Sequence, residues 1–281
     1  MSFKEIRSYA KVNLALNITG KTSSLHKIES IIAFISLHDK ILIRTIESND
    51  HKILFVGKFS KNINKNNTVR KLIKILEKKK LLTNQKFEIR INKKIPQKSG
   101  LAGGSMNAAS ILNYFVKRNI IKINRKDLLK ISKEVGSDVV LGLNPTNTIL
   151  TSKNRLKKFK NCKKIYTFIV KPNFGCSTKD IYSKVRKFNK SKFNSPSKKM
   201  FNFAYLKKMN NSLEPIVLSK HPKLKLIKYF LENLSKPAFV RMTGSGSALV
   251  AYFKTKKKCS IAKRQFVKKY KNFWCIASKT I

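Results

Sequence analysis

The sequence predicts an α+β fold in which strands and helices alternate along two domains. Apolar and polar residues alternate over residues 10–18, as in a strand with one buried face. Apolar residues recur every three to four positions over residues 67–79, as in a helix packed on a core. The 281 residues, of which 42% are hydrophobic, exceed the usual length of one domain and can fill a core.

Further elements are predicted from the same two periodicities. The short strands expected are 41–46, 53–56, 87–91, 165–170, 248–253 and 274–277, and the helices are 105–116, 127–135, 139–143, 224–234 and 260–270. Residues 188–199 are polar and irregular, which is typical of an exposed loop. Residues 151–164 are polar and basic, so we expect one domain over 1–150 and a second over 151–281.

The formal net charge of +50 has two interpretations. Clustered Lys and Arg side chains bind polyanions by releasing condensed counterions, which would indicate a nucleic-acid partner. The basic residues are instead spread from Lys4 to Lys279, and the runs 78–80 and 256–258 are short, which is typical of a solvated surface. An anionic substrate is compatible with both interpretations.

The cysteines and the N-terminus indicate a cytoplasmic protein. Cys162, Cys176, Cys259 and Cys275 show no paired CxxC spacing, so a metal or redox motif is not expected. Residues 1–9 contain charges and no apolar segment, and no apolar run reaches the roughly 20 residues that a membrane span needs.

The glycine-rich segment 95–109 is the strongest local signal. Gly100, Gly103 and Gly104 can adopt positive φ angles and allow close approach of the backbone, and a helix is predicted directly after them. The first N–H groups and the positive dipole end of a helix bind anions, so the segment can hold phosphate. It lacks the spacing of a Walker A motif. A tight structural connection explains the glycines equally well.

Three other features have a chemical and a structural interpretation. The glycine turn 243–247 could offer N–H groups to an anion or could simply connect two elements. Lys11 interrupts an apolar strand, and the strand's outward face would also explain it. Asp138 could cap the short helix after it. If the fold brings Lys11 and Asp138 together, the lysine keeps the carboxylate ionised and the carboxylate can accept a proton from a hydroxyl.

Three motifs occur in the order found in the GHMP kinase superfamily, which the chain therefore resembles. They are Ala10-Lys-Val-Asn-Leu14, the stretch 96–109 containing Gly-Leu-Ala-Gly-Gly-Ser, and Met242-Thr-Gly-Ser-Gly-Ser247. Within the superfamily the chain is most similar to the branch that phosphorylates a cytidine diphosphate-linked alcohol. Leu37-His-Asp39 and Gly136-Ser-Asp-Val-Val140 add to this resemblance, which spans nearly the whole chain.

The resemblance implies the superfamily's two-domain fold. The N-terminal half is expected to be similar to domain 2 of ribosomal protein S5, and the smaller C-terminal half to be an α/β domain. ATP is the implied phosphate donor, with Mg²⁺ carried by the ATP and no certain metal ligand in the chain. Positioning and charge neutralisation are most of what phosphoryl transfer requires.

The resemblance also implies a role for individual residues. Asp138 matches the catalytic base, and Lys11 matches its electrostatic partner and a contact to the γ-phosphate. The implied ATP-binding residues are Asn67, Pro96, Lys98, Ser99, Gly100, Leu101, Ala102, Gly103, Gly104 and Ser105. The implied substrate-binding residues are Asn13, Leu25, His26, Thr178, Tyr182, Thr243, Gly244 and Ser245.

The sequence departs from the family pattern in the base-binding stretch and in the phosphate loop. Ser23-Ser-Leu-His26 keeps the histidine that hydrogen-bonds cytosine but has Leu25 in place of a stacking tyrosine. Tyr182 matches an aromatic on the other face, and one lost stacking contact costs roughly 1–3 kcal/mol. Lys98 stands where glycine or alanine is common, and Met106 where serine is common. Lys98 could add charge beside the phosphates or point to solvent.

Two alternatives stay open at this stage. One is another small-molecule kinase of the superfamily, acting on homoserine, mevalonate or a sugar. The other is an RNA-binding protein with an S5-like fold, although no aromatic and basic single-strand signature is present and specific nucleic-acid binding is not expected. The partners expected are ATP and the alcohol, without a membrane, and the protein could be a monomer or a homodimer.

Overall fold

Two long strands near the N-terminus, β1 (Lys4–Lys21) and β2 (His26–Ile46), pair with each other. The computed structural model of the protein describes residues 2–23, 25–82 and 85–281. The predicted strand over 10–18 lies within β1, but its expected polar face is buried as well: Lys11, Asn13 and Asn17 are at most 5% exposed. Side-chain hydrogen bonds within the chain satisfy these polar groups, as burial requires.

The chain forms two compact units, neither of which is continuous in sequence. Unit 1 comprises Met1–Ala10, Leu37–Gln97 and Ala102–Pro145, and unit 2 comprises Lys11–Ser36, Lys98–Leu101 and Thr146–Ile281. Both β1 and β2 contribute residues to each unit. The expected domains 1–150 and 151–281 divide the chain at a single point, and that division stays a prediction.

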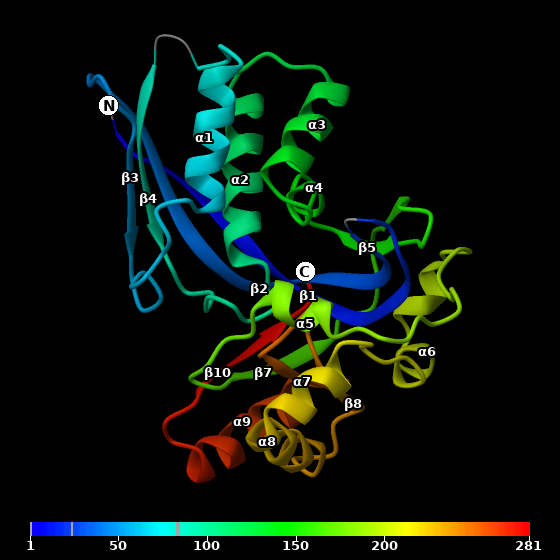
Figure 1. Cartoon of the computed structure of the whole chain (residues 1–281). Helices are drawn as coiled ribbons and strands as arrows, with labels where there is room; N and C mark the ends of the chain where they lie inside the picture. The colour runs from blue at the N-terminus through cyan, green and yellow to red at the C-terminus, as the bar shows by residue number, and fades with distance from the viewer. Residues whose placement is uncertain (1, 24, 83–84) are drawn as a thin grey trace. The chain divides into compact units, whose positions relative to one another are not determined.

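Unit 1 packs helices on a sheet (Figure 1). Strand β3 (Lys52–Val56) runs parallel to β4 (Lys86–Asn92), which pairs antiparallel with residues 40–46 of β2. Isoleucines of these strands, such as Ile41, Ile53 and Ile89, meet apolar side chains of the helices in one core. The helices are α1 (Thr68–Lys78), α2 (Gly103–Lys117), α3 (Arg125–Val135) and α4 (Val139–Gly142).

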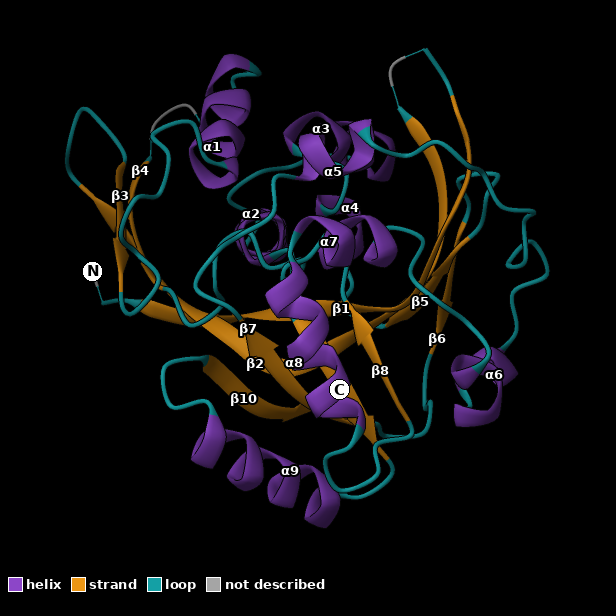
Figure 2. Ribbon diagram, turned by 60° about the horizontal axis from the view of Figure 1, so that its bottom comes forward, coloured by secondary structure: helices purple, strands orange, loops and turns teal. Residues whose placement is uncertain are grey.

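Unit 2 contains a four-stranded antiparallel sheet with the order β10-β7-β9-β8. These strands are β7 (Tyr166–Lys171), β8 (Phe239–Met242), β9 (Leu249–Phe253) and β10 (Trp274–Lys279), and the helices α8 (Pro222–Glu232) and α9 (Lys256–Lys269) pack on them (Figure 2). Shorter elements are β5 (Asn147–Leu150), which pairs with residues 30–32 of β2, β6 (Leu156–Phe159), α5 (Thr178–Ser183), α6 (Phe203–Lys207), α7 (Glu214–Lys220) and a 3₁₀ turn (Lys198–Phe201).

The predicted mixture of strands and helices is confirmed, and each predicted helix and strand overlaps an observed one. The prediction that residues 188–199 form an exposed loop is wrong at Phe193, which is 1% exposed. The buried carboxylate of Glu29 accepts hydrogen bonds from the N–H groups of Lys192 and Phe193, and this holds the segment against the strands. Across the described ranges, no helix is long and apolar enough to cross a membrane.

Candidate functional site

Lys11 and Asn13 lie on one face of β1, as their spacing predicted. The Lys11 ammonium donates a hydrogen bond to Oδ1 of Asn13 over 2.6 Å, and Nδ2 of Asn13 donates to the Ser30 hydroxyl over 2.8 Å. Lys11 is 5% exposed and Asn13 is 4% exposed. The alternative that Lys11 belongs to a solvated strand face is therefore wrong. The sequence offered no sign of Ser30, because the first half of β2 was not predicted as a strand.

Thr243 connects this strand to the glycine-rich segment within unit 2. Its hydroxyl accepts a hydrogen bond from the N–H of Asn13 over 2.9 Å and donates to the carbonyl of Gly100 over 3.3 Å. The main-chain N–H of Lys11 donates to the carbonyl of Leu101 over 3.2 Å. Residues of all three motifs thus lie together in one hydrogen-bonded cluster.

The two glycine loops pack on each other. The N–H of Ser247 donates to the carbonyl of Lys98, and the N–H of Ala248 donates to the carbonyl of Ser99. The N–H of Gly246 donates to the carbonyl of Thr243. The amides of residues 246–248 therefore have structural partners, which favours the interpretation of this part of the segment as a connecting turn.

Gly100 alone of the three glycines in the segment 100–104 takes a positive φ, of 77°. A Cβ there would lie 1.9 Å from the carbonyl oxygen of Thr243, so only glycine allows the two loops this close. Gly103 and Gly104 are helical, and within the segment 95–109 Lys98 (48°) and Ala102 (56°) also have a positive φ. Of the three glycines that permit a positive φ, Gly100 alone uses one. Lys98 is exposed, and its side chain lies against Gly175.

Helix α2 begins without a side-chain cap. Ala102 occupies the N-cap position in a left-handed conformation and has no side-chain group that could accept from the first N–H groups of the helix. Gly104 in the first turn is exposed, and a Cβ there would lie 3.1 Å from the Thr68 hydroxyl. An uncapped, accessible helix start suits an anion such as a phosphate group. Pro96 is buried just before the segment.

Asn67 is the N-cap of α1. Its Oδ1 accepts hydrogen bonds from the N–H groups of Val69 and Arg70, both over 3.1 Å, and its Nδ2 donates to the carbonyl of Asn64. The side chain therefore has a structural role that the sequence analysis did not assign. The role in holding adenosine stays a prediction.

Asp138 occupies the N-cap position of α4, but its side chain makes no capping hydrogen bond. Asp138 therefore lies at the predicted N-cap position, but the predicted capping hydrogen bond of its side chain is absent. Helix α4 packs closely on α2, since a Cβ on Gly142 would lie 2.6 Å from that of Ala109. Near the start of α2, the Ser105 hydroxyl lies 3.9 Å from where a Cβ on Gly136 would be. Within unit 1, the stretch that leads to Asp138 thus adjoins the first turn of α2.

His26 belongs to an aromatic group in unit 2. Its ring centroid lies 5.2 Å from that of Tyr182 and 6.4 Å from that of Phe188, and both pairs are tilted. Burial, with a further contribution from Lys21, lowers the pKa of His26 below its usual value, so the imidazole is neutral at pH 7. Leu25 is 72% exposed, and Ser24 lies outside the described residues. Phe188, which is 48% exposed, was missed because it was predicted to begin a loop.

Thr178 begins α5, and its hydroxyl lies 2.9 Å from that of Ser245 in the third motif. Ser177 caps this helix by accepting a hydrogen bond from the N–H of Asp180. The structure thus brings a predicted substrate-binding segment outside the three motifs to the glycine loop in unit 2. Within the described ranges, no group of three or more His, Cys, Asp or Glu residues could hold a metal ion.

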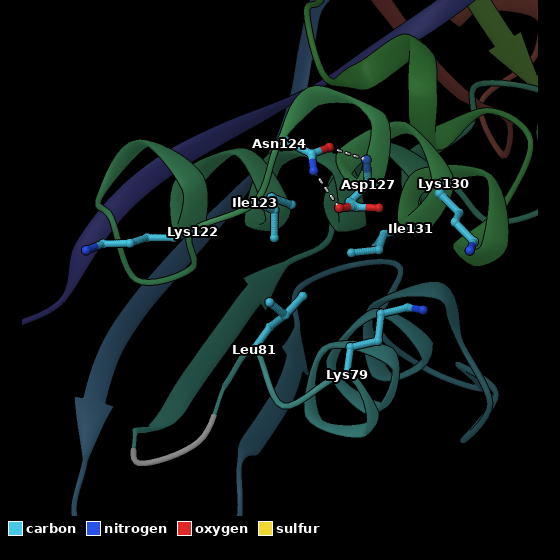
Figure 3. Close-up of a pocket in the computed structure, with 8 residues that line it drawn as sticks. All are labelled: Lys79, Leu81, Lys122, Ile123, Asn124, Asp127, Lys130 and Ile131. Carbon is cyan, nitrogen blue, oxygen red and sulfur yellow. Dashed lines mark hydrogen bonds between the residues drawn. The ribbon is translucent and has the colours of Figure 1, made fainter.

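A pocket of about 310 Å³ in unit 1 is separate from these residues (Figure 3). Asn124 and Asp127 at its rim hydrogen-bond to each other, and Leu81, Ile123 and Ile131 gather at its centre. No predicted site residue is among those that line it in the described chain. We therefore assign it no part in phosphate chemistry.

Comparison with known proteins relates this geometry to enzymes. The family model "GHMP kinases N terminal domain" matches residues 67–146. The 4-diphosphocytidyl-2-C-methyl-D-erythritol kinase of Pelagibacter ubique (strain HTCC1062) is 57% identical over 280 residues, covering 100% of this chain and 99% of that protein. The kinase of that name from Petrotoga mobilis is 32% identical, with 87% of this chain and 96% of that protein covered.

Solved structures show the same fold at lower identity. A crystal structure of 4-(cytidine 5'-diphospho)-2C-methyl-D-erythritol kinase superposes with a TM-score of 0.79 at 22% identity, covering 99% of this chain and all of that one. Homoserine kinase from Cytophaga hutchinsonii superposes with a TM-score of 0.74 at 16% identity, covering 100% of this chain and 95% of that one.

Proposed function

The chain belongs to the 4-diphosphocytidyl-2-C-methyl-D-erythritol kinases, which have the GHMP kinase fold, and from this membership we propose its reaction and the residues that perform it. The reaction is transfer of the γ-phosphoryl group of ATP to the 2-hydroxyl of 4-diphosphocytidyl-2-C-methyl-D-erythritol. It is a step of non-mevalonate isoprenoid-precursor synthesis. The names of the relatives favour this acceptor over homoserine, mevalonate or a sugar.

The observation that supports this proposal most is the junction of the three motifs in unit 2. Thr243 bonds both Asn13 on β1 and Gly100 in the glycine-rich segment. From Leu101 the chain continues into α2, whose first turn has no side-chain cap. The N–H groups of that turn bind the ATP phosphates, because a helix start offers donors and positive potential to an anion.

Asp138 acts as the general base, and Lys11 stabilises negative charge on the phosphate. The 2-hydroxyl oxygen forms a bond to the γ-phosphorus while the Asp138 carboxylate accepts the hydroxyl proton. The bond between this phosphorus and the β,γ-bridging oxygen breaks, and ADP leaves. The Lys11 ammonium, oriented by Asn13, neutralises charge on the γ-phosphate. Mg²⁺ carried by the ATP would supply further charge neutralisation.

The cytosine of the acceptor binds beside His26 and Tyr182. The neutral imidazole can accept or donate a hydrogen bond at the base edge, and the Tyr182 ring can stack on one face. Leu25 offers only aliphatic contact on the other face. Thr178, Gly244 and Ser245 bind the phosphate groups of the acceptor, and Asn67 helps hold the adenosine. None of the four cysteines, all in the described chain, is in a disulfide, which supports a cytoplasmic location.

A coupled assay of ADP release tests the reaction directly. The wild-type protein is given ATP, Mg²⁺ and one alcohol at a time: the cytidyl substrate, homoserine or mevalonate. We expect turnover with the cytidyl substrate. Turnover with another alcohol alone would overturn the proposed acceptor.

The variant Asp138→Asn tests the base. The amide cannot accept the hydroxyl proton, so we expect turnover to fall by about 10²–10⁴-fold while ATP affinity changes little. ATP binding measured by calorimetry provides the control. A near-normal rate would disprove the role of Asp138.

A further inference from the structure

The turn between α6 and α7 lies against the third motif in unit 2. Asn211 in this turn is 2% exposed, and its Nδ2 donates to the carbonyls of Met242 and Gly244, both over 2.8 Å. Its Oδ1 accepts from the N–H of Leu213 over 3.0 Å. The Asn211 amide group thus has partners on both its oxygen and its nitrogen, and two of them belong to the loop.

Glu214 holds the same loop from the first turn of α7. Its Oε2 accepts a hydrogen bond from the N–H of Met242 over 2.6 Å, and its Oε1 forms an ion pair with Lys228. The N–H of Glu214 donates in turn to the carbonyl of Asn211. Both main-chain polar groups of Met242 are therefore fixed by this pair of side chains.

The turn itself is bonded to β1, the strand that contains Lys11 and Asn13. The N–H of Leu16 donates to the carbonyl of Asn210 over 3.0 Å, and the N–H of Ser212 donates to the carbonyl of Leu16 over 2.9 Å. Since Thr243 also bonds Asn13, the strand, the turn and the loop form a closed network.

The loop needs such an external support because its own backbone is permissive. Gly244 has a φ of 54° and Gly246 a φ of 85°, and glycine has no side chain to restrict either angle. In a planar trans peptide the C=O and the next N–H point in opposite directions. Binding of the Gly244 carbonyl by Asn211 therefore also sets the direction of the Ser245 N–H. The Ser245 hydroxyl is paired with Thr178.

We propose that Asn211 and Glu214 are positioning residues that hold Met242–Gly244 so that Gly244 and Ser245 can bind the acceptor substrate. This inference rests on the proposed function for the identity of the substrate. Neither residue touches the reacting atoms, and neither lies in the three sequence motifs.

The variant Asn211→Ala tests the proposal by a split between kinetic constants. Asn211→Ala removes both hydrogen bonds and frees the loop, so we expect KM for the cytidyl substrate to rise at least about fivefold. KM for ATP should differ less than about twofold between Asn211→Ala and the wild type. Hydrogen exchange of the amides of residues 243–248 should accelerate in the variant without any substrate.

Asn113→Ala is the matched control. Asn113 also donates from Nδ2 to two main-chain carbonyls, those of Gly142 and Leu143 in unit 1. We expect this variant to lose thermal stability without a change in KM for the acceptor or in exchange of residues 243–248. Both variants are assayed well below their unfolding midpoints.

Glu214 offers a rescue by conservative replacement. Glu214→Gln keeps an oxygen that accepts from Met242, whereas Glu214→Ala removes it. We expect the glutamine variant to keep a KM near that of the wild type and the alanine variant to raise it.

The outcomes separate this inference from the proposed function. If the wild type turns over the cytidyl substrate but Asn211→Ala matches Asn113→Ala in KM and in loop exchange, the positioning role is overturned. If the wild type shows no such turnover, the proposed function fails, and exchange of residues 243–248 still decides whether Asn211 holds the loop.

Discussion

At the scale of single residues, the most informative observation is a buried lysine with a polar partner. An ammonium group withdrawn from water is destabilising unless hydrogen bonds or charges compensate it. Lys11 bonds to Asn13, and Asn13 bonds to Ser30, so the ammonium is held in one orientation. Such an oriented charge suits a role in neutralising phosphate.

Gly100→Ala should disable the site. A positive φ is unfavourable for alanine, and its Cβ would collide with the carbonyl of Thr243, so the two loops must separate. We expect unfolding free energy to fall by more than about 1 kcal/mol and kcat to fall sharply. Gly20→Ala is the control, because a Cβ there meets only the Lys27 side chain at 3.6 Å. Equal effects of the two substitutions would contradict this account.

The lowered pKa of His26 predicts how acceptor affinity depends on pH. In the proposed function a neutral imidazole binds the base, and burial lowers the pKa of His26 below the ordinary value of 6.5. The folded pKa lies below the unfolded one, so stability declines as the pH falls from the unfolded pKa to the folded pKa, and acceptor affinity declines as the pH falls below the folded pKa. KM for the cytidyl substrate measured between about pH 5 and 8 should rise only on the acid side. His26→Gln should remove this dependence, and its persistence would point to another group.

At the scale of elements, a buried ion pair supports the start of α2 in unit 1. The Asp39 carboxylate is fully buried, pairs with the Lys93 ammonium and accepts from the N–H groups of Lys94 and Ile95. A Cβ on Gly103, the first residue of α2, would lie 2.8 Å from Ile95 Cγ2. Asp39 thus holds the segment on which α2 begins, which explains the Leu37-His-Asp39 pattern in structural terms.

Asp39→Ala should be strongly destabilising. It leaves the Lys93 ammonium buried without its counter-charge, and removal of one partner of a buried pair typically costs about 3–5 kcal/mol. Denaturant unfolding measures the loss, and Asp39→Asn, which keeps an acceptor for the two N–H groups, should lose less.

The pH dependence of Asp39→Ala checks the cause. Burial lowers the pKa of Lys93 from 10.5, and Asp39 opposes this shift, so the variant lowers it further. Between this lowered pKa and 10.5 the unfolded state holds more protons than the folded state, so stability rises with pH over that range. The stability deficit of the variant should therefore shrink as the pH approaches about 10. A deficit that is constant with pH would indicate that the hydrogen bonds alone matter.

At the scale of the whole molecule, charge is the dominant property. The chain has 63 Lys and Arg residues against 13 Asp and Glu, so acidic partners are too few for most basic side chains. Like charges on one surface repel and oppose compaction. The buried network of unit 2 nevertheless depends on few charges, and the excess lies elsewhere on the surface.

Salt should therefore stabilise the protein. The Debye length falls from about 30 Å at 0.01 M to about 3 Å at 1 M, which screens surface repulsion. We expect the thermal unfolding midpoint to rise with sodium chloride over this range, with a nonionic solute of equal osmolality as control. Retention on a polyanion column should vanish at modest salt, as for nonspecific electrostatics. Retention at high salt would instead support the hypothesis of a specific nucleic-acid partner.

The sequence by itself determined the features that depend on neighbouring residues. Periodicity predicted α1 and β4 within one or two residues, and the shared face of Lys11 and Asn13 followed from the alternation of β1. The glycines before α2 indicated its loop, and the joint order of three motifs indicated a kinase, which the relatives confirm.

Only the tertiary structure decided which distant groups meet. The polar face of β1 looked solvent-exposed, because local alternation cannot show what packs on a face. The bonds of Thr243 to Asn13 and Gly100 span 230 and 143 positions, and Asn211 reaches the same loop across about 30. Long-range packing sets these contacts, so no local pattern could reveal that Asn211 supports the site.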